Sequence, residues 1–170
     1  PSTGVSVGNM FYGALNFNQP IGQWNITPTN CTNTFYSAHK FNQPLTNWNL
    51  PAVVSFMFRN ARMFNSYPGA FNSATTNVQY MFAGQNTNNP GVFNQDITGW
   101  DVSNVTNFGN MFANNTSFNQ PIGSWTINTT PGNTVTMLGM LYNADAFNQD
   151  ISSWDMRNVT SMSNFQPYKS

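Results

Sequence analysis

Few side chains in this 170-residue chain could do acid–base or metal chemistry. The sequence holds one histidine, His39, and five acidic residues, all of them aspartates. General acid–base catalysis needs a titratable side chain within reach of a group that orients it. His39 lies just before a repeated phenylalanine, where we expect an exposed loop. No Ser–His–Asp order, zinc-ligand spacing or glycine-rich phosphate loop accompanies it. The sequence therefore predicts no catalytic residue, no cofactor and no enzymatic activity.

The aspartates suggest calcium as the one metal to consider. Asp96 and Asp150 share one place of a repeated motif, and Asp101 and Asp155 share another. Calcium takes six to eight oxygen ligands at close range. The intervening copy of the motif has no carboxylate at either place. Carboxylates two coils apart would stand roughly 10 Å from each other. We therefore predict no metal site and interpret these residues as turn-capping or solvated carboxylates.

The motif that contains these aspartates is Phe-Asn-Gln-(Pro/Asp)-Ile-x-x-Trp, and it returns at intervals of roughly 25 residues. Its copies begin at Phe17, Phe41, Phe93, Phe118 and Phe147, and a degenerate copy begins at Phe64. A fixed period of this length is typical of a solenoid, in which each unit buries its apolar side against its neighbours. We predict a solenoid of about six coils, with residues 1–170 as a single repeat domain. The chain begins inside a repeat, so we expect it to be part of a larger protein or assembly.

Each unit has two parts with different local chemistry. The segment Gln-Pro-Ile-Gly-Gln-Trp is short, bounded by Pro, Gly and Asn, and favours one short parallel strand per coil. The second part, such as Val105–Phe112, spaces apolar residues three to four apart and predicts a short α- or 3-10-helical segment. A strand plus a short helical segment per coil is the leucine-rich-repeat plan.

Aromatic residues hold the first and eighth places of every motif copy and align with an aliphatic residue between them, as an inward stripe would. We therefore predict that they form the core ladder. Its members are Phe17, Trp24, Phe41, Trp48, Phe64, Phe71, Phe93, Trp100, Phe118, Trp125, Phe147 and Trp154. Evenly spaced aromatics can also form a platform on which sugars stack, which is the functional alternative.

Asparagine follows the first aromatic in every copy, at Asn18, Asn42, Asn65, Asn94, Asn119 and Asn148. An amide side chain both donates and accepts hydrogen bonds. Repeated once per coil, it can bond the backbone of its own turn and the amide of the next coil. We predict an Asn ladder that satisfies polar groups where the chain bends. Ligand contact is the alternative interpretation.

Two insertions, Gln85–Gly91 and around Asn128–Asn133, lengthen the repeat and should be surface loops. Seven Asn-x-Ser/Thr sequences occur, at Asn25, Asn30, Asn104, Asn114, Asn115, Asn128 and Asn158. In a secretory route they would be glycosylation acceptors. Asn104 and Asn158 share one repeat place, which favours a turn-forming role instead.

Charged residues make up only 6% of the chain, and the formal net charge is zero. The basic residues are spread along the sequence, at Lys40, Arg59, Arg62, Arg157 and Lys169. This distribution lacks the electrostatic footprint of a nucleic-acid-binding protein. No run of about 18 apolar residues predicts a membrane span, and a single cysteine, Cys31, excludes an intramolecular disulfide. An uncharged but hydrated surface suits an extracellular or particle-surface location.

Two stretches, from Phe93 to Asn107 and from Phe147 to Met162, share the pattern Phe-Asn-Gln-Asp-Ile-x-x-Trp-Asp-x-x-x-Val-Thr. This pattern resembles the repeat of the BspA-like leucine-rich-repeat surface proteins, and the resemblance covers nearly the whole chain. It implies a right-handed solenoid, usually part of a larger secreted or surface-anchored protein that attaches to host proteins or other cells. In three copies Pro replaces Asp, and the resemblance transfers no binding residue.

Two functions remain open. In the first, the chain is a surface-exposed module for adhesion or recognition of a protein or glycan partner. The candidate contact residues outside the repeat pattern are Tyr12, Tyr36, Tyr67, Tyr80 and Tyr142. Among them, Tyr12, Tyr36 and Tyr142 could form a partner-binding rim or merely cover the core edge. In the second, the chain is a structural component, a decoration or a filament or envelope subunit of a virion or cell surface. It would then contact identical neighbouring copies.

Overall fold

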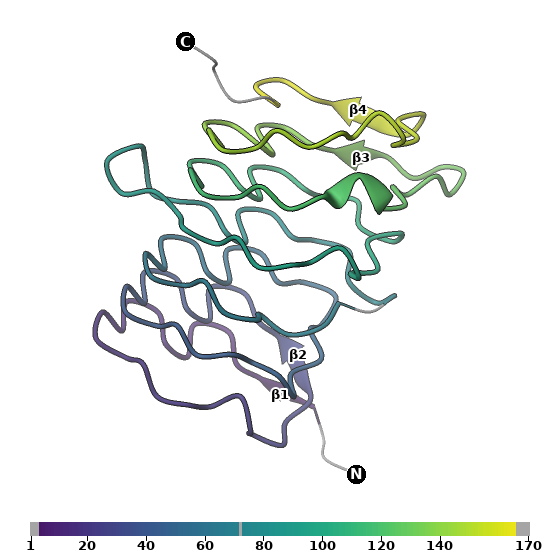
Figure 1. The fold of residues 1–170 in the computed structure, drawn as a ribbon. Coiled ribbons are helices and arrows are strands. Elements are labelled where there is room, and N and C mark those ends of the chain that lie inside the picture. The colour runs from purple at the N-terminus through teal and green to yellow at the C-terminus, as the bar shows by residue number, and fades with distance from the viewer. Residues whose placement is uncertain (1–3, 72, 166–170) are drawn as a thin grey trace.

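The computed structural model describes residues 4–71 and 73–165 of the chain. The chain winds into a stack of similar coils, from β1 at one end to β4 at the other (Figure 1). The regular elements are short: strands β1 (Val5–Ser6), β2 (Pro28–Asn30), β3 (Val135–Thr136) and β4 (Val159–Ser161), and the 3-10 helix η1 (Ile122–Ser124). Turns and extended segments make up most of the rest.

Parallel pairing joins neighbouring coils along one side of the stack. β1 pairs with β2, with Val5 opposite Pro28 and Ser6 opposite Asn30. β3 pairs with β4 in the same sense. Single parallel bridges extend this pairing, from Val53 to Asn77, from Asn77 to Asn107 and from Asn107 to Thr136. Each pair joins residues about one repeat apart, so every coil is bonded to the next.

The strands and turns do not occupy the expected parts of the repeat. The motif segment from Phe17 to Trp24, where we expected a strand, contains none. The paired residues follow the Trp instead, as Pro28–Asn30 do in β2. The segment Val105–Phe112, where we expected a helix, contains a bridge at Asn107 followed by turns. In the described part of the chain, η1 is the only helical segment.

Backbone hydrogen bonds explain why no helix forms in this segment. The N–H groups of Phe108, Asn110 and Phe112 donate to carbonyls of the next coil at 2.8 to 2.9 Å. The intervening N–H groups of Met111 and Ala113 donate back to the carbonyls three residues earlier, each at 3.1 Å. A helix would direct every N–H group along its own axis. Here every second N–H group joins two coils, and the remainder close tight turns.

These turns impose a backbone conformation that few residue types tolerate. A β-turn whose third residue has positive φ favours Gly or Asn at that position. Such positions recur four residues apart along the coils. Asn or Gly fills them at Asn9, Gly13, Asn33, Asn60, Asn110, Asn114, Gly139, Asn143 and Asn164, and Ser37, Phe56 and Tyr80 are exceptions. The positive-φ turns therefore account for part of the abundance of asparagine.

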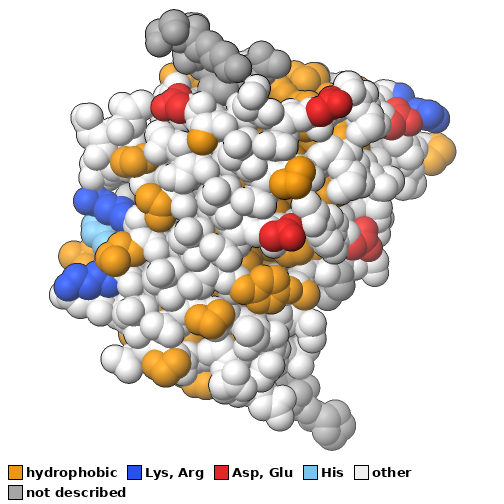
Figure 2. Space-filling model, in the orientation of Figure 1, with side chains coloured by type: hydrophobic (Ala, Val, Ile, Leu, Met, Phe, Trp, Pro, Cys, Tyr) orange, Lys and Arg blue, Asp and Glu red, His pale blue; other side chains and the backbone are white. Residues whose placement is uncertain are grey.

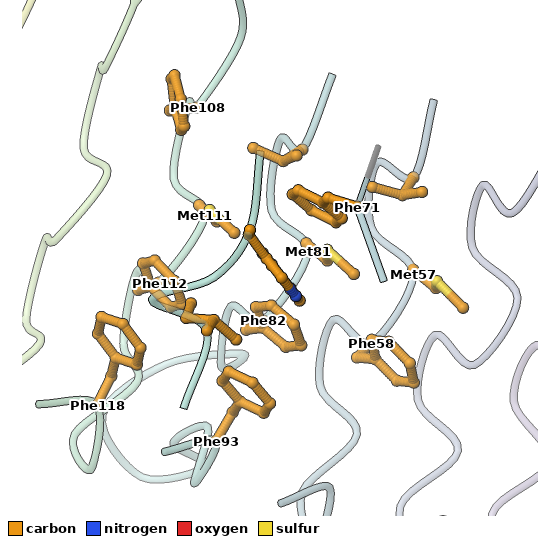
Figure 3. Close-up of a cluster of buried hydrophobic side chains, with 14 of the residues drawn as sticks. Met57, Phe58, Phe71, Met81, Phe82, Phe93, Phe108, Met111, Phe112 and Phe118 are labelled. Atoms are coloured by element: carbon orange, nitrogen blue, oxygen red, sulfur yellow. The ribbon is translucent and has the colours of Figure 1, made fainter. Parts of the chain in front are cut away.

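Stacked phenylalanines fill the middle of the core (Figure 3). Phe58, Phe82 and Phe112 lie in one row, with ring centroids 5.6 and 5.8 Å apart. Within their own coils, Phe82 stacks on Phe93 and Phe112 on Phe118, each pair at 3.8 Å. Such aromatic pairs contribute about 0.5–1.5 kcal/mol each beyond the burial of their surface. Each ring thus contacts both its own coil and a neighbour.

The structure buries ten of the twelve aromatics assigned to the core ladder, namely Phe41, Trp48, Phe64, Phe71, Phe93, Trp100, Phe118, Trp125, Phe147 and Trp154. Phe17 is half-buried and packs on Phe11, 4.0 Å away. Trp24 is 40% exposed, so its assignment to the buried core was wrong. It belongs to the coil of β1, which lies at one end of the described stack (Figure 1).

The tryptophans also bond one coil to the next through their indole nitrogens. Nε1 of Trp48, Trp125 and Trp154 donates to the backbone carbonyls of Ile21, Ile97 and Ile122 in the preceding coil, at 3.3, 3.1 and 3.0 Å. Trp100 belongs to the motif copy that comes after the degenerate one. Its Nε1 is buried without a partner among the described residues. Its ring instead stacks on Phe71 at 3.7 Å.

The predicted Asn ladder residues hydrogen-bond from coil to coil. Oδ1 of Asn18, Asn42, Asn65, Asn94 and Asn119 accepts the backbone N–H of the next ladder residue, through to Asn148, at 2.8 or 2.9 Å. The same oxygens accept a second hydrogen bond from the following side chain of the next coil, at Gln43, Ser66, Gln95, Gln120 and Gln149. Polar groups at this bend are therefore satisfied between coils.

Replacing a ladder amide should destabilise the stack. In Asn94→Ala, the N–H of Asn119 and the amide of Gln120 lose their shared acceptor. Because these donors are partly buried, we expect the free energy of unfolding to fall by about 1–3 kcal/mol in urea denaturation. The matched variant Asn16→Ala, at an exposed asparagine outside the ladder, should change it by less than about 0.5 kcal/mol. Equal effects would contradict a structural role of the ladder.

Trp125 and Trp24 hold the same repeat place but should contribute differently to the stability of the fold. Trp125 is 4% exposed, stacks on Trp154 at 6.4 Å and bonds Ile97. We expect Trp125→Ala to lower the free energy of unfolding by about 3–5 kcal/mol. Trp24→Ala should cost much less, because that side chain is already 40% exposed. Urea unfolding followed by circular dichroism measures both, and a Trp125 variant as stable as the parent would refute the core assignment.

Candidate binding surface

One edge of the stack gathers aromatic side chains around an arginine. The aromatic–arginine edge consists of Tyr12, Tyr36, Phe56, Arg59 and Tyr80. Tyr12 and Tyr36 stack with centroids 4.9 Å apart and planes 12° apart. Phe56 and Tyr80 stack at 4.9 Å and 13°. Tyr12, Tyr36 and Arg59 hold the same repeat place in successive coils, so coil stacking aligns them along one edge.

The guanidinium of Arg59 lies against three of these rings. Its central carbon is 4.5 Å from the centroid of Tyr80 and 5.6 Å from those of Tyr36 and Phe56. Cations within about 6 Å of a ring centroid are attracted by the ring quadrupole. Among the described residues, the single ion pair joins Asp155 to Arg157, at 2.7 Å. Arg59 is therefore surrounded by aromatic rings and has no carboxylate counter-ion there.

Two residues of this edge have an unfavourable backbone conformation. Phe56 and Tyr80 have φ of 60° and 55°. The equivalent places in other coils hold Asn9, Asn33 and Asn110, which tolerate positive φ better. For bulky residues this conformation costs about 1–2 kcal/mol each. Strain of this kind persists where the surroundings hold the residue in place, and it concentrates at functional sites.

Further polar groups flank the edge. Asn60 Nδ2 donates to Ser37 Oγ at 2.9 Å and contacts His39 Nε2 at 3.3 Å. Arg62 Nε donates to Asn60 Oδ1 at 3.4 Å. Partial burial, and then the positive charge of Arg62, lower the pKa of His39. His39 is half-buried rather than the exposed loop residue that we expected.

The charges of the chain are separated in space. Residues 4–92 contain three cations, Lys40, Arg59 and Arg62, and no acidic residue. Residues 93–165 contain all five aspartates and Arg157. Figure 2 shows cationic side chains gathered with the histidine at one edge, while most of the acidic ones lie elsewhere on the visible face. Arg62 lies near His39, since both contact the side chain of Asn60.

The structure groups only some of the predicted rim tyrosines. Tyr12, which is 56% exposed, and Tyr36 lie together. Tyr142 has the same repeat place but lies near the other end, and Ala83 and Ala113 interrupt the row between them. Sequence reasoning missed Phe56 and Arg59 and did not group Tyr80 with the rim. The signal that could have found Phe56 and Tyr80 is their replacement of the asparagine that other coils carry at that place.

The aspartates bond to their own turns. Oδ1 of Asp96, Asp101, Asp150 and Asp155 accepts the backbone N–H two residues later, at 2.9 to 3.1 Å. These are Asx turns, in which the carboxylate caps a bend. In residues 4–71 and 73–165, no group of three or more His, Cys, Asp or Glu side chains is arranged to hold a metal ion. No helix in those ranges is long and apolar enough to cross a membrane.

The cysteine and two of the seven asparagines of the glycosylation sequences are buried. Cys31 is buried, and burial raises the pKa of its thiol to about 12, against the opposing effect of the Thr34 hydroxyl. Asn115 and Asn128 are buried. Asn104 and Asn158 donate their amide nitrogens to backbone carbonyls of the preceding coil, each at 2.9 Å. These bonds give both asparagines a structural contact between coils, whereas the turn-forming role stays a prediction. Asn25 and Asn30 are exposed.

Comparison with known families places the chain in one of them. Residues 3–92 and 73–169 both match DUF285, described as a Mycoplasma protein of unknown function. The chain therefore belongs to this family, which in general terms is the BspA-like repeat family that the sequence resembles. No curated protein and no solved structure matches the chain.

The capping carboxylates should make the free energy of unfolding depend on pH. Hydrogen bonds from the turns lower the pKa of Asp96, Asp101, Asp150 and Asp155 in the folded state. Their stabilisation is therefore present above the unfolded-state pKa of about 3.9 and is lost as pH falls through the lower folded-state values. Urea unfolding between pH 6 and pH 2 should show this decline.

Replacing all four aspartates by asparagine supplies the control, because asparagine keeps the Oδ1 acceptor but does not titrate. The decline in stability toward low pH should then flatten. An equally steep decline in the asparagine variant would contradict this origin of the acid sensitivity.

Proposed function

We propose that this chain is a non-enzymatic recognition module that binds a protein or glycan partner through the aromatic–arginine edge. The observation that carries the proposal is Arg59, which lies against three aromatic rings without a carboxylate partner among the described residues. We further propose a BspA-type, right-handed, leucine-rich-repeat-like solenoid on an extracellular or particle surface.

The scaffold suits recognition because it holds the edge rigidly. The coils beneath Tyr36, Phe56 and Tyr80 are joined by backbone hydrogen bonds of 2.8 to 3.2 Å. Tyrosine and arginine are the residue types that most often dominate the energy of binding interfaces. Rings held in place by stacking lose little conformational freedom on binding. The edge therefore supports a preformed contact surface better than a flexible one.

The distribution of titratable groups supports binding rather than catalysis. The capping aspartates are engaged by their own turns. The His39 ring and the Arg62 side chain both contact the amide of Asn60, which is neither a nucleophile nor a carboxylate. Acid–base chemistry needs such groups to converge.

A second function, assembly with identical copies, rests on a different observation. Met10, Leu15 and Trp24 are 48%, 50% and 40% exposed on the coil that carries β1. Exposed apolar surface of this kind fits a neighbouring coil or another copy. Analytical ultracentrifugation over a range of concentrations tests this function. A monomer at all concentrations argues against it, whereas ordered polymers argue against a free-standing adhesin.

A binding screen on arrays of glycans and extracellular-matrix proteins tests the recognition function. The edge variant combines Tyr36→Ala with Arg59→Ala. The control combines Tyr142→Ala with Arg157→Ala, which removes the same residue types near the other end of the stack. We expect at least one array ligand to lose about tenfold or more in affinity with the edge variant only. Ligands that bind both variants equally, or no ligand at all, would count against the edge.

A further inference from the structure

We propose that Arg59 is an oxyanion-binding residue and that the ligand of the aromatic–arginine edge is an acidic polysaccharide. Its carboxylate or sulfate groups would bind the guanidinium. This inference deepens the proposed function and rests on it, since it names the class of partner for the same edge. Three features of the described residues carry it: the setting of Arg59, the orientation of the rings and the sign of the surrounding charge.

The setting of Arg59 prepares it for an anion. Rings of Tyr36, Phe56 and Tyr80 surround the guanidinium at 4.5 to 5.6 Å, and none of them accepts a strong hydrogen bond at its face. Among the described residues, the side chain of Arg59 has no carboxylate partner. A guanidinium presents its N–H donors as a planar fork that matches the two oxygens of a carboxylate or sulfate. Stacking restricts that fork before any ligand arrives, which lowers the entropic cost of binding.

The orientation of the rings argues against neutral sugars and nucleobases. Tyr12 faces Tyr36, and Phe56 faces Tyr80, with planes only 12° and 13° apart. Pairwise stacking covers one face of each ring, and the guanidinium of Arg59 lies over Tyr36, Phe56 and Tyr80. These three rings therefore offer mainly their edges and, in tyrosine, the hydroxyl. The edge of an aromatic ring carries partial positive charge, while the face carries negative charge. An approaching ligand therefore meets donors and positive edges, which favour oxyanions over stacking partners.

The charged residues near Arg59 are also positive. Arg62 lies beside His39 and Asn60, and Lys40 follows His39 in sequence. No acidic residue occurs in residues 4–92. Figure 2 shows these cationic types together at one edge. Three cations are far fewer than the phosphate contacts of typical nucleic-acid-binding proteins, where affinity grows with each phosphate neutralised.

The regularity of the edge favours a polymer with repeated anionic groups. Tyr12, Tyr36 and Arg59 occupy equivalent places in successive coils, and the stacked ring pairs share a centroid spacing of 4.9 Å. Such a row can contact a linear chain at several points, and each further contact raises the overall affinity. An acidic polysaccharide repeats its carboxylate or sulfate along the chain, whereas an acidic peptide segment needs no such repetition.

Binding to defined polymers tests the inference. The probes are heparin, which carries sulfates and carboxylates, hyaluronan, which carries carboxylates alone, neutral dextran, and poly-glutamate as an acidic peptide. Isothermal titration calorimetry compares the parent chain with Arg59→Gln, Arg59→Lys and the control Arg157→Gln. Arg59→Gln and Arg157→Gln change the net charge equally, so a difference between them reports the site and not the overall charge.

We expect the parent to bind heparin, hyaluronan or both, more weakly as salt rises, and to ignore dextran. Arg59→Gln should lose about tenfold or more in affinity, because hydrogen bonds to charged groups are among the strong ones. Arg59→Lys, which keeps the charge but not the fork, should fall between Arg59→Gln and the parent. Arg157→Gln should bind as the parent does. Comparing heparin with hyaluronan separates sulfate from carboxylate recognition.

Several outcomes would overturn the inference. These are equal binding of dextran, stronger binding of poly-glutamate than of both polysaccharides, equal losses in Arg59→Gln and Arg157→Gln, or no binding of either acidic polysaccharide by folded protein. Thermal unfolding of each variant establishes that it is folded. If the acidic polysaccharides fail but an array ligand still depends on Tyr36 and Arg59, the proposed function stands without this ligand class. If no ligand depends on the edge, both fail.

Discussion

The structure depends on how each coil divides its backbone N–H groups. In the turn segments, one N–H group donates to the next coil and the following one closes a turn in its own coil, as Asn110 and Met111 illustrate. This alternation satisfies the backbone without long strands or helices. It also fixes positive φ at places four residues apart, such as Asn110 and Asn114. The asparagine and glycine residues at these places follow from this constraint.

Asparagine serves the constraint in two ways. At turn places it tolerates positive φ, because its short polar side chain costs less there than a bulky one. At the second place of each motif copy it accepts hydrogen bonds from the next coil, as Asn65 does from Asn94 and Gln95. Because uncharged amides make these contacts, the surface needs few charged residues. The low charge of 6% is thus compatible with a backbone whose polar groups are well satisfied.

The repeat period, most core aromatics and the ladder asparagines could be predicted from the sequence, because equivalent residues in a regular stack meet equivalent neighbours. The location of the strands could not, since the bonds that define β2 or the bridge at Asn107 come from other coils. Trp24 was misplaced because its repeat place gives no information about whether a neighbouring coil covers it. Arg59 was missed because the motif was aligned on its Phe-Asn-Gln part, whereas Arg59 belongs to the turn segment between copies.

Bulky residues at the positive-φ places, where other coils carry asparagine or glycine, therefore carry information about function. A scaffold that prefers asparagine or glycine at positive φ has no structural need for Phe56 or Tyr80 there. Strain of about 1–2 kcal/mol at each place opposes them. Their mutual stacking and their contacts with Arg59 offset part of this cost, because aromatic pairs and cation–π contacts each contribute about 0.5–1.5 kcal/mol. Asparagine would satisfy the turn without either contact. The two rings are thus best explained by what they hold in place, which is the guanidinium of Arg59.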